Sequence, residues 1–183
     1  MEHPGEVWQE LDYNGTRLGG IVSNNLDLSK IKLFVGVAMM LYRYRNGEVE
    51  FLFQHRSKFL RGNPDKWDVS AGGHINLNEE EVVAMRREAW EEIGAEIDVN
   101  ELEIAAFYRR QHDAMVCLYF YDWGERKDEF RFNDQEVEEV KWVKYTELEE
   151  FLPNLKTAVR EDEVFMHYMA TWNARILEKY GDL

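Results

Sequence analysis

The stretch "GGHINLNEEEVVAMRREAWEEIG", residues 72–94, gathers acidic side chains near the end of one expected helix. Glu88, Glu91 and Glu92 are spaced as helical neighbours, and like charges so placed cost about 0.2–0.5 kcal/mol per pair. They also precede Gly94, a residue typical of helix C-termini, where the helix dipole favours cations. A solvated acidic face is the common alternative for such a run. The acid at the unfavourable end instead indicates a bound cation, and clustered oxygen ligands suit Mg²⁺ or Mn²⁺.

The boundaries of this helix can be predicted from its capping residues. Asn78 is a good N-cap and Glu81 stands three positions on, as in a capping box, so we expect a helix over residues 79–93. Thr146 and Glu149 form a second capping box, which predicts another short helix.

Strands account for much of the remaining chain. Residues 6–22 and 32–57 each read as a hairpin around an Asn-Gly turn, at residues 14–15 and 46–47. Further strands are expected within residues 67–70, 102–110, 114–123 and 136–145, and a terminal helix over residues 162–179. Mixed strands and helices predict an α/β sandwich in which helices cover a mixed sheet.

Composition limits the function classes. The chain has 183 residues, 45% of them apolar, and a net charge of −14. That charge argues against a nucleic-acid polymer as partner, although a local basic pocket or a metal still permits a single nucleotide. Cys117 is the only cysteine, which suits a reducing cytoplasm. The longest apolar run, residues 33–42, is shorter than the roughly 20 residues of a membrane helix, and the first residues are unlike a signal peptide.

The opening stretch resembles the Nudix box, G-x5-E-x7-R-E-U-x-E-E-x-G-U, where U is aliphatic. Its fixed positions are occupied by Gly73, Glu79, Arg87, Glu88, Glu91, Glu92 and Gly94. Ala89 and Ala95 stand at the U positions and are smaller than usual, a departure that should affect packing rather than chemistry. The resemblance implies a Nudix α/β/α sandwich as one domain over 1–183: an N-terminal hairpin extension (1–30), a core (31–152) and a C-terminal helical segment (153–183).

Nudix proteins mostly hydrolyse a nucleoside diphosphate linked to another moiety, with a divalent metal. The resemblance implies metal ligands at the carbonyl of Gly72 and at Glu88, Glu91 and Glu92. Glu91 and Glu92 would thereby take part in catalysis, while Arg87 and Glu79 would pair to hold the loop and helix together. The implied cofactor is Mg²⁺ or Mn²⁺.

Family members often place a further acid shortly before a Trp-containing strand, which here is residues 134–142. Glu136 is the first choice as added ligand or general base, and Glu138 and Glu139 are the alternatives. Strand alternation should put Glu136 and Glu138 on one face and Glu139 on the other. A solvated edge strand is the plainer reading of each of these acids.

Four basic or imidazole side chains are candidates for substrate binding. Arg56 and Arg61 would contact phosphates, with surface solvation as the alternative. His74 would contact metal or phosphate, although a lone histidine is more often a structural hydrogen-bonding group. Arg109 lies where family members often bind the base or sugar. We expect Trp67, Trp90 and Trp142 in the core rather than as stacking platforms.

Residues 51–74 and 6–20 resemble the branch of the family related to isopentenyl-diphosphate isomerase. In that enzyme a catalytic cysteine lies two residues before the histidine that matches His74. Gly72 stands there instead, and Cys117 lies far downstream in an expected buried strand. Hydrolysis is therefore favoured over isomerisation. A non-enzymatic nucleotide-sensing module is a third alternative, opposed by the intact carboxylates.

The substrate itself stays open. ADP-ribose, a nucleotide sugar, a nucleoside triphosphate and a dinucleotide polyphosphate all remain candidates, as does the number of metals. Nudix hydrolases are often dimers, so a homodimer is an expectation of the resemblance.

Overall fold

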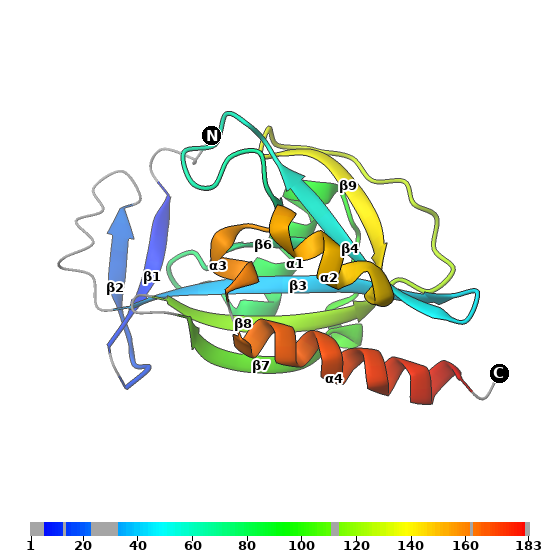
Figure 1. Ribbon diagram of the computed structural model, residues 1–183. Coiled ribbons are helices and arrows are strands. Elements are labelled where there is room, and N and C mark those ends of the chain that lie inside the picture. The colour runs from blue at the N-terminus through cyan, green and yellow to red at the C-terminus, as the bar shows by residue number, and fades with distance from the viewer. Residues whose placement is uncertain (1–5, 13, 23–32, 111–113, 162, 182–183) are drawn as a thin grey trace.

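The computed structural model describes residues 6–12, 14–22, 33–110, 114–161 and 163–181. The strands, shown in Figure 1, are β1 (Val7–Leu11), β2 (Arg17–Val22), β3 (Leu33–Arg45), β4 (Glu48–Arg56), β5 (Trp67–Asp68), β6 (Ala71–His74), β7 (Glu103–Arg110), β8 (Ala114–Asp122) and β9 (Val137–Lys144). The helices are α1 (Glu81–Ile93), α2 (Leu148–Phe151), α3 (Thr157–Arg160) and α4 (Glu163–Tyr180), with 3-10 turns at η2 (Val99–Glu101), η3 (Tyr145–Glu147) and η4 (Leu152–Asn154).

The strands form one mixed sheet organised around β3. This long strand runs antiparallel to β1, β4 and β6 and parallel to β8. β9 adds to β4 and β7 adds to β8, both antiparallel. The predicted turn between β3 and β4 is present, since Asn46 (φ 53°) and Gly47 (φ 84°) both adopt the left-handed conformation that a tight hairpin requires.

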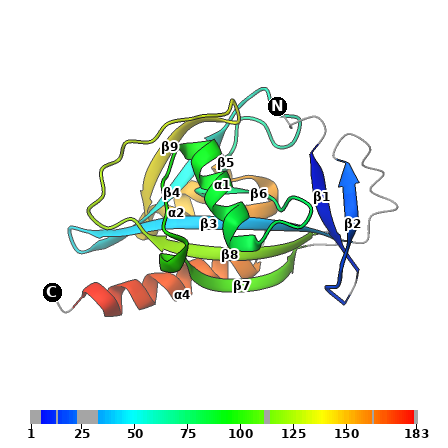
Figure 2. The ribbon, with the colours of Figure 1, turned by 180° about the vertical axis from the view of Figure 1, so that it is seen from behind.

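Helices cover both faces of this sheet. Met39 and Leu41 point to the face covered by α1, whereas Met40 and Tyr42 point to the face covered by α2, α3 and α4. This alternation is the two-residue period of a strand buried on both sides. Figures 1 and 2 show the two helical layers from opposite sides, with the N-terminal hairpin at one end of the sheet. The predicted α/β/α sandwich with an N-terminal hairpin and a C-terminal helix is confirmed.

Both predicted capping boxes were wrong. α1 begins at Glu81 rather than residue 79, and Asn78 (φ 64°) lies in the preceding loop, where its N–H donates to Gln9. Glu79 stays outside the helix because Arg87 and the Asn76 N–H hold its carboxylate. Thr146 lies in η3 and donates its hydroxyl to Glu48 instead of capping a helix.

Ala89 and Ala95, the small residues at the aliphatic positions of the box, are both buried in the core cluster that α1 covers. Their positions agree with the expectation that their size affects packing. Trp67 and Trp142 are partly buried against the core clusters. The prediction for Trp90 was wrong, since this side chain on the outer face of α1 is 52% exposed.

The predicted subdivision of the chain remains an expectation, because residues 1–5 and 23–32 lie outside the described part. In the described residues, no helix combines the length and apolar character needed to cross a membrane.

Candidate active site

Arg87 fastens the loop before α1 to the helix itself. Its guanidinium donates to both carboxylate oxygens of Glu79 (2.9 and 2.9 Å) and to the carbonyl of His74 (2.9 Å). The same group reaches Glu88 (2.7 Å) and Glu91 (3.0 Å) on the helix. A planar fork can meet this many acceptors at once, so Arg87 sets the position of the loop relative to the acidic residues.

Glu92 is the most buried of these acids, with 3% of the residue exposed. Its carboxylate accepts a hydrogen bond from the Gly72 N–H (2.7 Å) and one from the Gln54 amide (3.2 Å). Burial raises the pKa of Glu92 well above its usual value, and the neighbouring charge of Glu88 adds to the effect. A buried carboxylate without an ion-pair partner among the described residues is costly, and either a proton or a bound cation relieves that cost.

Glu88 lies beside Glu92 and directly against Gly73. A Cβ on Gly73 would come within 2.3 Å of Glu88 Oε1, so only glycine lets this carboxylate approach the strand. Burial raises the pKa of Glu88 to about 7; the Arg87 charge opposes the shift, and Glu91 and Glu6 increase it. Glu91 is more open and pairs with Arg87.

The donor set fits a hard divalent cation. Glu92 supplies buried carboxylate oxygens and Glu88 partly buried ones. Gln54, itself buried, leaves its Oε1 without a hydrogen-bond partner among the described groups. An unsatisfied buried acceptor costs roughly 1–3 kcal/mol, and a cation or its water shell would satisfy it. In the parts of the chain that are described, no three Asp, Glu, His or Cys side chains already form a compact ligand group. Cation binding would thus draw the carboxylates closer together.

The three acids after the box differ in their surroundings. Glu138 accepts from the Lys58 N–H (3.2 Å) and the Ser57 hydroxyl (3.5 Å), so it holds the loop after β4. Glu139 is exposed and lies 3.8 Å from His55. Glu136 precedes β9, and its backbone carbonyl accepts from the Ser57 N–H (2.7 Å). The prediction that strand alternation puts Glu136 and Glu138 on the same face therefore does not apply, because Glu136 lies outside β9.

Asp134 is a site residue that the sequence reasoning missed. Its N–H donates to the carbonyl of Glu91 (3.1 Å), which attaches this loop to the end of α1. Its carboxylate accepts from the Glu136 N–H (2.9 Å), and its charge contributes to the raised pKa of Glu92. The residue lies within a stretch already inspected for acids, but only the folded loop brings it to Glu92.

The predicted phosphate-binding arginines are placed differently. Arg56 donates to the carbonyls of Gly62 (3.1 Å) and Asn63 (3.3 Å) and pairs with Asp68 (3.3 Å), so it orders the loop that contains Arg61. Arg61 itself is exposed in that loop.

Lys156, from the segment before α3, also reaches the buried Asp68 (3.3 Å). Two cations then share one carboxylate, which leaves a local positive surplus suited to phosphate. No pattern in the sequence connected Lys156 with Asp68, because residues far apart in the chain meet only in the fold.

His74 and Arg109 complete the predicted substrate contacts. The His74 ring stacks on Trp8 with centroids 3.6 Å apart and planes 8° apart. Burial lowers the pKa of His74 to about 4, with Lys156 and Arg87 adding to the shift, so its ring is neutral near pH 7. Arg109 lies in β7 opposite Met115, and its side chain belongs to the part of the chain that is not described.

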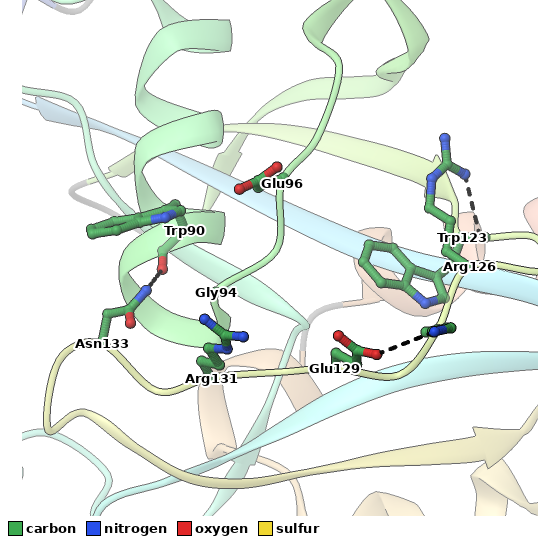
Figure 3. Close-up of a pocket in the computed structure, with 9 residues that line it drawn as sticks. Trp90, Gly94, Glu96, Trp123, Arg126, Glu129, Arg131 and Asn133 are labelled. Atoms are coloured by element: carbon green, nitrogen blue, oxygen red, sulfur yellow. Dashed lines mark hydrogen bonds and ion pairs between the residues drawn. The ribbon is translucent and has the colours of Figure 1, made fainter.

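A separate pocket of about 370 Å³ lies at the C-terminal end of α1. Trp90, Gly94, Trp123, Arg131 and Asn133 contribute to its walls, as Figure 3 shows. It contains none of the side chains predicted for metal or substrate binding. The Asn133 side chain donates to the carbonyl of Trp90 (2.6 Å), so this wall mainly anchors the loop that leads to Asp134.

Comparisons with known proteins agree with this fold. An uncharacterized Nudix hydrolase of Listeria monocytogenes is 26% identical over 154 residues, covering 81% of this chain and 89% of the relative. A crystal structure from Deinococcus radiodurans superposes with a TM-score of 0.69 at 21% identity, covering 85% of this chain and 96% of that one. The NUDIX domain of Shewanella oneidensis NrtR, solved with ADP ribose, gives 0.59 at 16% identity, covering 79% and 94%.

The family model described as the NUDIX domain matches residues 32–169, which includes the whole acidic stretch and most of the chain. The chain therefore belongs to the Nudix family.

Proposed function

We propose that this Nudix protein is a metal-dependent hydrolase that cleaves the phosphoanhydride bond of a nucleoside diphosphate linked to another moiety. One observation carries the proposal: Glu92 is buried beside the partly buried Glu88, and no cationic side chain described in the fold contacts Glu92. A non-catalytic module would have no need to retain such a costly pair.

The site residues would serve in metal binding, proton transfer and phosphate binding. Glu88 and Glu92, with Glu91 and the Gly72 carbonyl, would hold Mg²⁺ or Mn²⁺, which supplies charge neutralisation at the diphosphate and activation of water. Glu136 would accept the proton of the attacking water, with Asp134 fixing its backbone. Lys156, Arg61 and His74 would bind the phosphates, while Arg56 orders the loop.

The substrate class follows from chemistry and from relatives. A neighbour of the same fold was solved with ADP ribose, which is a nucleoside diphosphate linked to a sugar. We extend this class, rather than that compound, to the present chain. The homodimer and the cytoplasmic location stay predictions.

Isopentenyl-diphosphate isomerisation is less well supported. A Cβ on Gly72 would lie 2.7 Å from the carbonyl oxygen of Val37 and 3.2 Å from Ala38 Cα. Both neighbours are backbone atoms of β3, so this strand leaves no room for the cysteine that the isomerase places there.

A screen for phosphate release tests the proposal. Nucleoside diphosphate sugars, ADP-ribose, nucleoside triphosphates and dinucleotide polyphosphates are incubated with enzyme and Mg²⁺ or Mn²⁺. We expect turnover of at least one class, its loss in excess EDTA, and its loss in Glu92→Gln. Turnover that persists undiminished in EDTA would contradict the metal mechanism.

A further inference from the structure

The pocket at the C-terminal end of α1 shares no lining residue with the acidic site and has a mixed, mainly basic lining. Its volume of about 370 Å³ falls within the roughly 300–1,000 Å³ of pockets that hold small ligands. The cations on its walls outnumber the carboxylates: Arg126, Lys127 and Arg131 stand against Glu96 and Glu129. In a chain with a net charge of −14, a local excess of positive charge favours an anionic ligand.

The three cations differ in how far they are already paired. Arg126 pairs with Glu101 (2.7 Å) and donates to two backbone carbonyls. Lys127 lies 3.7 Å from Glu129 in an exposed pair. Arg131 is exposed and has no ion-pair partner among the residues that the structure describes. Its backbone is fixed, since its N–H donates to the carbonyl of the last residue of α1 (3.0 Å), so its guanidinium is well placed to bind a phosphate.

The pocket also offers aromatic surface and an unsatisfied donor. Trp90 and Trp123 lie on opposite sides of it, with Arg131 between them, as Figure 3 shows. Trp90 is 52% exposed, and an open indole ring is a platform on which a nucleobase can stack. The Trp123 N–H is buried and has no acceptor among the described groups. An acceptor on a bound ligand would satisfy this donor, which is costly to leave unpaired.

We propose that this pocket binds a nucleoside monophosphate, with the Arg131 guanidinium on the phosphate and the Trp90 ring against the base. Glu96 and Glu129 would accept hydrogen bonds from the ribose hydroxyl groups, as an acidic side chain does in dinucleotide-binding folds. This inference goes beyond the proposed function and does not depend on it, although the proposed cleavage would release compounds of this class.

A ligand in this pocket would join α1 to the loop between β8 and β9. Trp90 belongs to the helix and Arg131 to the loop, so a molecule that contacts both connects the two segments. Asn133 already links them, because its side chain donates to the carbonyl of Trp90 (2.6 Å) and its N–H to the carbonyl of Glu91 (3.1 Å). Binding should therefore raise the melting temperature as well as change the fluorescence of the tryptophans.

Calorimetric titration with AMP in EDTA tests the proposal, with tryptophan fluorescence as a second readout. AMP should bind to wild type and to Glu92→Gln alike, because the pocket lies outside the acidic site. Arg131→Gln and Trp90→Ala should each weaken AMP binding by about tenfold, the order expected for a charge-assisted hydrogen bond or a stacked base. Both variants change exposed side chains and should melt close to wild type without ligand.

Arg86→Gln is the matched control for Arg131→Gln. Arg86 is exposed on the same helix as Trp90 but does not line the pocket, so this variant should bind AMP as wild type does. Inorganic phosphate, ribose 5-phosphate and adenosine are titrated in parallel. Each lacks part of the nucleotide, so each should bind more weakly than AMP.

Three results would overturn this inference. AMP binding that is lost in Glu92→Gln and unchanged in Arg131→Gln would place the nucleotide in the acidic site. Inorganic phosphate that binds as tightly as AMP would show a site for a simple anion. Neither heat nor a fluorescence change at millimolar AMP would show that the pocket holds only water. Each result leaves the proposed function standing, because hydrolysis is measured separately by phosphate release.

Discussion

Gly73 shows how one missing side chain shapes the site. A Cβ there would overlap the Glu88 carboxylate, which is the mobile end of a side chain and can move away. We therefore expect Gly73→Ala to fold, to melt within a few degrees of wild type in EDTA, and to lose about tenfold or more in Mn²⁺ affinity. Gly62→Ala is the control, since no atom lies within 4 Å of a Cβ at Gly62. Wild-type Mn²⁺ affinity in Gly73→Ala would show that Glu88 is not a ligand.

The raised pKa of Glu88 predicts how stability depends on pH. In the folded protein without metal its pKa is about 7, above the ordinary value of 4.5, so the folded state binds the proton more tightly than the unfolded state does. This contribution is fully present below pH 4.5 and is lost as the pH rises through about 7. Urea unfolding in EDTA across this range should therefore give a free energy of unfolding that falls with pH, and Glu88→Gln should flatten that fall. A wild-type free energy that rises over the same range, with the rise absent in Glu88→Gln, would contradict the assignment.

Gly72 separates hydrolysis from isomerisation. Because backbone atoms of β3 occupy the space that a side chain would need, Gly72→Cys should be destabilised and should not gain isomerase activity. Incubation of isopentenyl diphosphate with wild type or the variant and metal should yield no dimethylallyl isomer. Clear conversion by wild type would overturn the functional assignment.

The loop between β8 and β9 attaches Asp134 to the end of α1, and Asp134 in turn accepts a hydrogen bond from the Glu136 N–H. Glu136→Gln should lower kcat by a factor of about 10²–10⁴, the usual contribution of a general base, with little change in melting temperature. Glu138→Gln should do the reverse, because its carboxylate holds the Lys58 N–H and the Ser57 hydroxyl. Near wild-type kcat in Glu136→Gln, together with an inactive Asp134→Asn, would identify Asp134 as the base.

At the scale of elements, the sequence predicted what depends on local pattern. The Asn-Gly turn before β4, the strands and the terminal helix follow from residue preferences and alternation. The predicted helix start at residue 79 was wrong because Glu79 forms an ion pair with Arg87 and does not join the first turn of the helix. An N-cap residue stabilises a helix by about 1 kcal/mol, and here the several charge-assisted hydrogen bonds of the Arg87 guanidinium outweigh that preference.

The site was predictable where a fixed spacing defines it. Glu88, Glu91 and Glu92 lie on one helix, so their proximity follows from helical geometry. Lys156, Asp134 and Trp8 come from other segments, and their approach depends on how the sheet, the loop after β8 and the hairpin pack. No single-sequence pattern records that packing. The sequence also could not show that Arg56 pairs with Asp68 and donates hydrogen bonds to the loop carbonyls.

At the scale of the whole molecule, residues from three other parts of the fold come together at the acidic face of α1. β4 contributes Gln54, β6 contributes Gly72 and Gly73, and the N-terminal hairpin contributes Trp8 through His74. The fold thus fixes a cluster of negative charge in a chain whose net charge is already −14. Such an arrangement is unfavourable by itself, and cation binding would offset its cost.

The most direct test compares the melting temperatures of wild type and Glu92→Gln in EDTA and in saturating Mg²⁺. Glutamine removes a charge from a repelling pair and from the negative end of the helix dipole, which should stabilise the metal-free protein by up to about 1 kcal/mol. Wild type alone gains the full binding energy of the metal, about 2.7 kcal/mol at a hundredfold excess over Kd. Glu92→Gln should therefore melt at or above wild type in EDTA and below it in Mg²⁺. If the variant melts clearly below wild type even in EDTA, the carboxylate is a structural partner of Gly72 and Gln54, and the metal account of the acidic helix is wrong.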